Sequence, residues 1–173
     1  FGEHNIGALA LMKREEYASG NMFKNYREDW VSRFTYDYAS KYLLEFNGAY
    51  NGSEKFGPGY RFEFFPSLAA GWYVSNEKFF KIDWINRLKL RYSIGMVGDD
   101  QGGGRWLYDS QYSYGGAARM NQNPNEVSPY SYYRESVVGN PDIHWEKALK
   151  NNYGIEIGVL DNLISLNYDY FTE

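Results

Sequence analysis

The side chains best suited to catalysis are scarce in this chain. It contains no cysteine and only two histidines, His4 and His144. Thiolate chemistry and disulfides are therefore excluded, and histidine-based catalysis or imidazole metal sites have little to draw on. His144 lies in the stretch NPDIHWEK, next to a tryptophan and Glu146. Because no nucleophile or second carboxylate accompanies it, we interpret this stretch as the entry to a strand.

The carboxylates do not form a recognisable catalytic or metal motif either. Asp99 and Asp100 in GDDQGGG are candidate calcium ligands, but calcium takes six or more oxygen ligands and the loop pattern D-x-[DN]-x-[DN]-G is absent. A glycosidase needs two carboxylates at a defined separation, and no such pair can be assigned along the chain. We therefore predict no metal, no cofactor, no catalytic residue and no enzymatic activity.

The side chains in this sequence that are best suited to ligand binding are aromatic. Its 173 residues include 18 tyrosines, 11 phenylalanines and 5 tryptophans. Flat rings stack on sugars or peptide side chains, and tyrosine hydroxyls add hydrogen bonds at modest entropic cost. Within the long segment 97–151 we predict ligand contacts for Arg105, Trp106, Tyr108, Tyr112 and Tyr114, with Tyr130, Tyr132 and Tyr133 nearby. The alternative is that these aromatic residues only pack the loops together or contact a partner protein.

The elements that position these residues are predicted to be strands with one apolar and one polar face. In RLKLRYSIGM (87–96) bulky apolar residues alternate with basic or small ones, and side chains of a strand point alternately to opposite faces. The same alternation predicts strands at 33–38, 42–50, 67–74, 152–159 and 163–170, and with weaker alternation at 4–12. The apolar faces of the six regular strands carry no charge. The other faces carry eight charged residues, which we predict to face a lumen: Arg33, Asp37, Glu45, Arg87, Lys89, Arg91, Glu156 and Asp169.

Alternation alone fits two architectures, a soluble β-sandwich that binds carbohydrate and a membrane β-barrel, since each has one apolar face. The links favour the barrel. Short links at 39–41 and 160–162 take turns with long ones at 13–29, 51–65 and 97–151, and the link at 75–86 is intermediate, with room for one helical turn. Outer-membrane barrels have short periplasmic turns and long extracellular loops. The net charge of −4 gives no bias toward nucleic acid.

Specific sequence motifs also link the chain to a known family. The stretch 33–80, with FFPS…GW, the stretch 85–100, with LKLR.S.G..G, and the stretch 137–171, with NP…WEK…N.G, closely resemble the barrel of SusC/RagA-type TonB-dependent transporters of Gram-negative bacteria. Residues 3–11 resemble it more loosely. Residues 101–136 fall where the loops of this family vary, so they inherit nothing from the resemblance.

The resemblance implies that residues 1–173 are all-β and form part of a large antiparallel transmembrane barrel, about seven of some 22 strands, in the C-terminal part of that barrel. It implies an outer-membrane location and active import of oligosaccharides or peptides. The implied partners are a SusD-like surface lipoprotein that closes over the mouth, the TonB complex and outer-membrane lipid. The plug domain and the TonB box of such transporters are not found in this chain, so we expect it to be a fragment of the functional unit.

Overall fold

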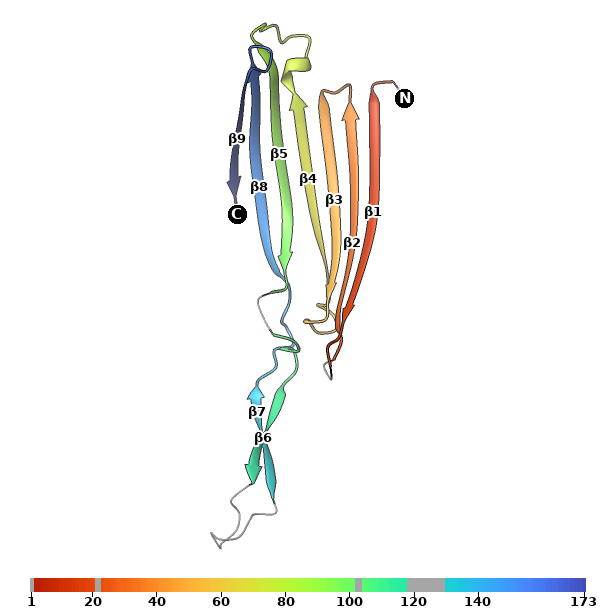
Figure 1. The fold of residues 1–173 in the computed structure, drawn as a ribbon, viewed down its shortest axis with the longest axis vertical. Coiled ribbons are helices and arrows are strands. Elements are labelled where there is room, and N and C mark those ends of the chain that lie inside the picture. Colours follow the sequence, from red (N-terminus) through yellow and green to blue (C-terminus); the bar gives the residue numbers. More distant parts are fainter. Residues whose placement is uncertain (1, 21–22, 102–103, 118–129) are drawn as a thin grey trace.

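The computed structural model describes residues 2–20, 23–101, 104–117 and 130–173 as an all-β chain with one turn of 3-10 helix. Seven strands form one antiparallel sheet in the order β1-β2-β3-β4-β5-β8-β9, and two form a separate hairpin, β6-β7 (Figure 1). The bounds are β1 His4–Tyr17, β2 Asn25–Tyr38, β3 Tyr42–Ser53, β4 Phe62–Tyr73, η1 Val74–Asn76, β5 Ile85–Asp99, β6 Gln111–Ala117, β7 Ser131–Val137, β8 Glu146–Val159 and β9 Ile164–Thr172. Within the described residues, no helix is both long and apolar enough to cross a membrane.

The register of the sheet brings all predicted apolar faces to the same side. Directly paired residues share a face, so one row can be followed across all seven strands: Ile6, Tyr36, Leu44, Ala70, Tyr92, Tyr153 and Tyr170. The next row lies on the opposite face: Gly7, Thr35, Glu45, Ala69, Ser93, Asn152 and Phe171. The phase predicted for the six regular strands is therefore confirmed.

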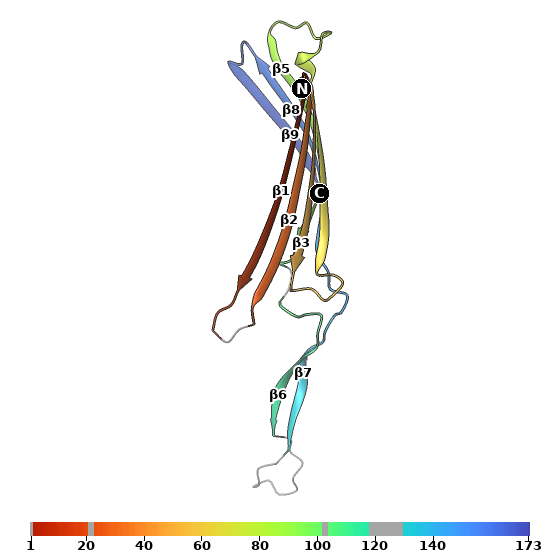
Figure 2. The ribbon, with the colours of Figure 1, turned by 90° about the vertical axis from the view of Figure 1, so that its right-hand side faces the viewer.

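The sheet is a single curved layer (Figure 2). A concavity of about 610 Å³ runs from β1 to β8, and most of its lining residues belong to the polar face. The polar face is thus the concave one, and the apolar face is convex and open to the surroundings. Leu90 and Phe46 are each more than a third exposed on it. No second sheet covers the apolar side in the described part of the chain, so the alternative of a β-sandwich with a shared dry core is wrong.

Strand lengths differ from the sequence-based expectation. The strands continue beyond the regular alternation, which leaves links of 18–24, 54–61 and 100–145 at one end, where 13–29, 51–65 and 97–151 were expected. Backbone pairing continues there although charged residues such as Arg14 and Glu28 appear on the apolar face. The β4–β5 link, 74–84, is longer than two of the links at the opposite end, so strict alternation of short and long links does not hold.

The two ends of the sheet nevertheless differ clearly. The tight turns 39–41 and 160–163 and the β4–β5 link lie at one end, the turn end, and the other three links lie at the opposite, loop end (Figure 1). The turns use left-handed backbone at Ala39 and Ser40 and again from Leu160 to Asn162. At the loop end the hairpin β6-β7, which was not predicted, extends away from the sheet.

Candidate functional site

Two rows of aromatic residues cross the convex face. At the turn end the rings of Tyr38, Tyr42 and Trp72 lie side by side, with centroids 6.3 and 6.5 Å apart. At the loop end Trp30 pairs with Tyr50, which pairs with Phe64. The span of β2 from Trp30 to Tyr38 is nine residues, which is the length of a tilted strand that crosses a bilayer, about 9–11 residues.

The convex face between these two rows is free of charge on all seven strands. Its paired positions carry aliphatic, aromatic and small side chains, together with the uncharged polar residues Ser32, Asn151 and Thr172. Tyr92 donates a hydrogen bond to Asn151 (3.2 Å), which satisfies that amide on the apolar side. Charges return only beyond the loop-end row, at Arg14 and Glu28 for example. We call this surface, from one aromatic row to the other, the apolar band.

Glu77, in the β4–β5 link, joins the turn-end row together. Its carboxylate accepts hydrogen bonds from the Tyr42 hydroxyl (2.6 Å) and the Trp72 indole (3.3 Å), and it pairs with the Lys41 ammonium (3.1 Å). The Tyr42 hydrogen bond, followed by the Lys41 contact, holds the pKa of Glu77 below its ordinary value. The link is thereby fastened to the apolar side of the sheet.

Acidification is expected to release this link. Because the pKa of Glu77 is lower in the folded protein, its stabilising contribution is fully present above the ordinary glutamate pKa of about 4.5. It is lost as the pH falls through the lowered value in the folded state. Trp72 fluorescence should therefore change on acid titration of the wild type and not in Glu77→Gln. An unaltered acid transition in Glu77→Gln would contradict the role of this carboxylate.

The eight charged residues predicted to face a lumen share the concave face. Their register partners all belong to the polar rows. Arg91 on β5 reaches across β8 to Asp169 on β9 (3.0 Å). It also pairs with Glu156 on the adjacent strand β8 (3.1 Å), and Lys89 lies 3.8 Å from the same carboxylate. Arg33 pairs with Glu45 (3.4 Å) in the same way.

Asp37 and Arg87 differ from these pairs. Asp37 accepts a hydrogen bond from the Ser40 backbone and so caps the turn between β2 and β3. Among the described residues no carboxylate lies within 4.0 Å of Arg87, so its guanidinium forms no ion pair with this part of the chain.

A glycine makes the Arg91–Asp169 contact possible. Gly154 lies between the two residues in the register. A Cβ at this position would lie 2.7 Å from the Asp169 carboxylate and 2.8 Å from Arg91 Nε. The side chains therefore meet above a backbone that carries no side chain of its own.

This ion pair is expected to contribute a small, salt-dependent free energy. A double-mutant cycle of Arg91→Gln and Asp169→Asn should give a coupling of about 0.2–1 kcal/mol at low salt, since both groups are partly exposed. The cycle isolates the coupling between Arg91 and Asp169 from the contact that Arg91 also makes with Glu156. A coupling of zero at low salt would mean that the contact carries no stability.

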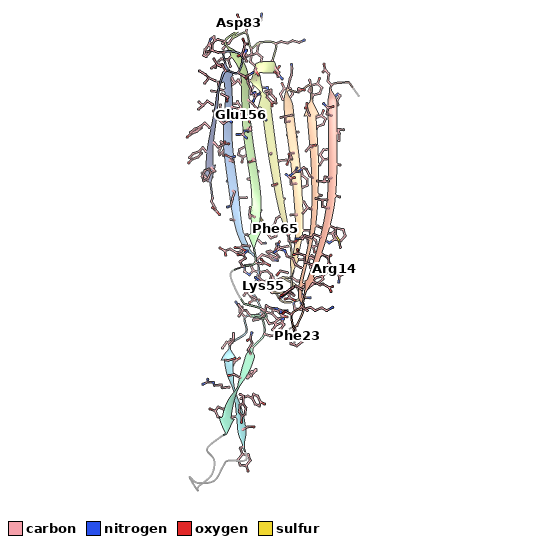
Figure 3. All side chains as sticks on the ribbon, in the orientation of Figure 1. Arg14, Phe23, Lys55, Phe65, Asp83 and Glu156 are labelled. Carbon is pink, nitrogen blue, oxygen red and sulfur yellow. The ribbon has the colours of Figure 1, made fainter. Side chains whose placement is uncertain are left out.

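At the loop end Arg105 fastens three links to one another. It donates hydrogen bonds to the backbone carbonyls of Phe23 (3.0 Å) and Lys24 (2.7 Å), and it pairs with Glu54 (2.7 Å). Its guanidinium lies 4.5 Å from the centre of the Trp106 ring, whose edge-to-face partner is Phe23. Figure 3 shows Phe23 and Lys55 at this end of the sheet.

A charged cavity of about 540 Å³ lies on the concave side at this end. Its lining includes Arg27, Glu54, Lys55 and Asp100. Arg27 lies 3.5 Å from the Asp100 carboxylate, and Lys55 donates a hydrogen bond to the Asp100 carbonyl (2.8 Å). Asp100 is recognisable from the sequence as a candidate ligand, but Arg27 and Lys55 are not, because their position follows from β2 and the β3–β4 link meeting the end of β5.

The five residues predicted to contact a ligand fall into two groups. Arg105, Trp106 and Tyr108 belong to the loop junction, where Tyr108 packs beside Gly57. Tyr112 and Tyr114 lie on β6 of the hairpin and are well exposed, as are Tyr132 and Tyr133 on β7. The Tyr114 and Tyr133 rings meet edge to face at 5.8 Å. The structure therefore does not bring the five residues into one site.

Among the described residues, Trp145 is the largest fully buried side chain, 1% exposed. It packs on Phe56 and Phe65, with ring centroids 5.1 and 5.4 Å apart, and its indole donates a hydrogen bond to the Arg61 carbonyl. The neighbouring His144 contacts the Asp142 carbonyl through Nδ1 (2.7 Å). Strand β8 begins at Glu146, so the predicted entry to a strand is confirmed. Within the described residues, no group of three or more His, Asp or Glu side chains is arranged to hold a metal ion.

An open antiparallel sheet with a charge-free convex band between two aromatic rows, and a charged concave wall, is a segment of a transmembrane β-barrel. The chain is 31% identical over 163 residues to the TonB-dependent receptor SusC of Bacteroides thetaiotaomicron, which is 93% of this chain and 16% of that protein. It is 30% identical over 146 residues to TonB-dependent receptor P39 of Formosa agariphila, which is 82% of this chain and 13% of the relative. No protein-family model matches the chain.

The fold is also found in solved structures. A structure of the RagAB peptide transporter matches with a TM-score of 0.80 at 20% identity, over 99% of this chain and 21% of the matched chain. The same importer in its 'open-open' state gives a TM-score of 0.81 with the same coverage. The resemblance to SusC/RagA-type TonB-dependent transporters is thus confirmed over most of the chain, which spans only a small part of the length of these relatives.

Proposed function

We propose that this chain is a barrel segment of an outer-membrane transporter that takes up oligosaccharides or peptides with energy delivered through TonB. The observation that carries the proposal is the combination of the apolar band with the charged concave wall. The apolar band can contact the hydrocarbon of a bilayer, and the charged concave wall can line a water-filled or plugged lumen. The named relatives are receptors and a peptide transporter, which supports transport and not catalysis as the activity.

The difference between the two ends supports an orientation. Barrels of this kind have their short turns in the periplasm and their long loops outside the cell. The turn end would then face the periplasm, and the loop junction and the hairpin β6-β7 would face the medium. A SusD-like surface lipoprotein would cover this loop end, and substrate would pass the cavity lined by Arg27, Glu54 and Lys55 on its way to the lumen.

The exposed tyrosines of the hairpin are the part of the predicted ligand site that remains available for contact. Tyr112 and Tyr114 are both more than half exposed, whereas Arg105 is engaged with the chain itself. We assign substrate contact to the tyrosines and a positioning role to Arg105.

The test uses the full-length protein in its own host. Deletion of the gene should abolish growth on one class of polymer, oligosaccharide or peptide, and loss of TonB should have the same effect. Recovery of the protein in the soluble fraction, or uptake that persists without TonB, would overturn the proposal. Tyr112→Ala with Tyr114→Ala should weaken uptake of that polymer, while Tyr153→Ala, which removes an exposed tyrosine of the convex face, should not.

A further inference from the structure

The β4–β5 link does not extend straight away from the sheet at the turn end. Glu77 fastens it to Tyr42 and Trp72, which both belong to the convex face. Phe79, two residues further along the link, lies with its ring centroid 6.4 Å from that of Trp72. The link therefore folds toward the apolar side and continues the turn-end aromatic row.

Beyond this fastening the link exposes large apolar side chains. Phe79 is 67% exposed, Trp84 is 61% exposed, and Ile82 is also exposed. The Leu160 backbone N–H donates to the Trp84 carbonyl (3.1 Å), so the β8–β9 turn, with Leu163 81% exposed, lies next to the link. Exposed apolar side chains that adjoin an aromatic row favour the interfacial zone of a bilayer, where one end of an aromatic side chain is apolar and the other is wet.

The charges of the link complement this surface. Lys78 and Lys81 are exposed, and within the described part of the chain neither has a carboxylate within 4.0 Å. The carboxylate of Glu77 is already engaged with Lys41, and that of Asp161 accepts a hydrogen bond from Asn86. Asp83, labelled at the turn end in Figure 3, is the remaining carboxylate of the link. Lysines beside an apolar segment extend their ammonium groups to lipid phosphates.

We propose that residues 78–84 form a lipid-binding segment, with Phe79, Ile82 and Trp84 inserted at the level of the headgroups and Lys78 and Lys81 bound to the phosphates of anionic phospholipids. This inference rests on the proposed function, because it needs the apolar band to lie in a membrane. Its occupant is phospholipid of the leaflet at the turn end. The continuity of the segment with the aromatic row is the reason for choosing lipid over a protein partner.

Depth measurements test the insertion. The chain contains no cysteine, so spin labels can be placed at Phe79→Cys and Ile82→Cys in the full-length protein, with any cysteine elsewhere replaced, after reconstitution in phospholipid vesicles. Leu68→Cys, in the middle of the apolar band, and Tyr114→Cys, on the hairpin, are the matched controls. Accessibility to oxygen and to a water-soluble nickel complex should place 79 and 82 between these controls.

The outcomes separate this inference from the proposed function. Labels at 79 and 82 that are as accessible to water as the label at 114, while the label at 68 is in lipid, would overturn the inference and leave the proposed function intact. A water-accessible label at 68 would overturn both. Lys78→Gln and Lys81→Gln should each lower the retention of phosphatidylglycerol about fivefold at low salt. Lys24→Gln, at the loop end, should leave retention unchanged, and equal retention in all three variants would overturn the role of the lysines.

Discussion

Replacing Leu68 by arginine is expected to destabilise the membrane-inserted protein by about 2–4 kcal/mol, the cost of a cationic side chain on the lipid face near the middle of a bilayer. Leu68 pairs with Phe46 and Ile94 on the convex face, about midway between the two aromatic rows. No acidic side chain lies on this part of the face to pair with the arginine. The measurement is the free energy of unfolding by urea from vesicles of defined lipid.

Two adjacent alanines provide the control for this prediction. Ala69 and Ala70 follow Leu68 on β4 and point to opposite faces. Ala70→Arg should be destabilising, although less than Leu68→Arg because it lies closer to the turn-end row. Ala69→Arg should have little effect, since Glu45 is its register partner on the concave wall. Equal effects of the two alanine variants would show that the convex face does not contact hydrocarbon.

Replacing Trp145 by alanine is expected to cost about 3–5 kcal/mol of local stability at the loop end, the usual range for removing a large buried aromatic side chain. Trp145 is the centre of the small core that joins the β3–β4 link, through Phe56, to β4, through Phe65. Its loss leaves a cavity and removes the hydrogen bond to the Arg61 carbonyl. Hydrogen exchange of the segments around Phe56 and Ile143 reports this local opening.

The control for this prediction is another tryptophan. Trp84→Ala removes an exposed side chain at the turn end and should leave exchange at the loop end unchanged. Trp145→Phe should retain most of the stability, because a phenyl ring can still pack between Phe56 and Phe65. If Trp145→Ala left loop-end exchange at the wild-type rate, the three-residue core would not anchor the long link.

The faces of the strands could be predicted from the sequence, but their ends could not. Phe46, Leu90 and Ile157 were assigned to the apolar side from alternation alone, and the register confirms each of them. The strands were predicted too short at the loop end, because charges such as Glu28 break the alternation where the sheet leaves the apolar band. Backbone hydrogen bonds do not depend on side-chain polarity, so the pairing continues past the last regular residue.

The positions of the loop-end side chains, in contrast, could not be predicted from the sequence. Arg105 and Tyr112 are seven residues apart and were predicted to share one site, yet Arg105 is bound to the β1–β2 and β3–β4 links while Tyr112 lies on the hairpin. Links have no periodic pattern that fixes the direction of a side chain. The burial of Trp145 likewise depends on Phe56 and Phe65, which are about 80 or more residues away in the chain.

The sequence by itself determined the class of structure, the two faces of each strand and the absence of charge from one of them, since a period of two is a local property of extended backbone. Only the tertiary structure decided which charges meet. Lys89 and Arg91 reach Glu156 because β5 pairs with β8 across the long link 100–145. Partners so distant along the chain are chosen by register and curvature, which act over the whole sheet.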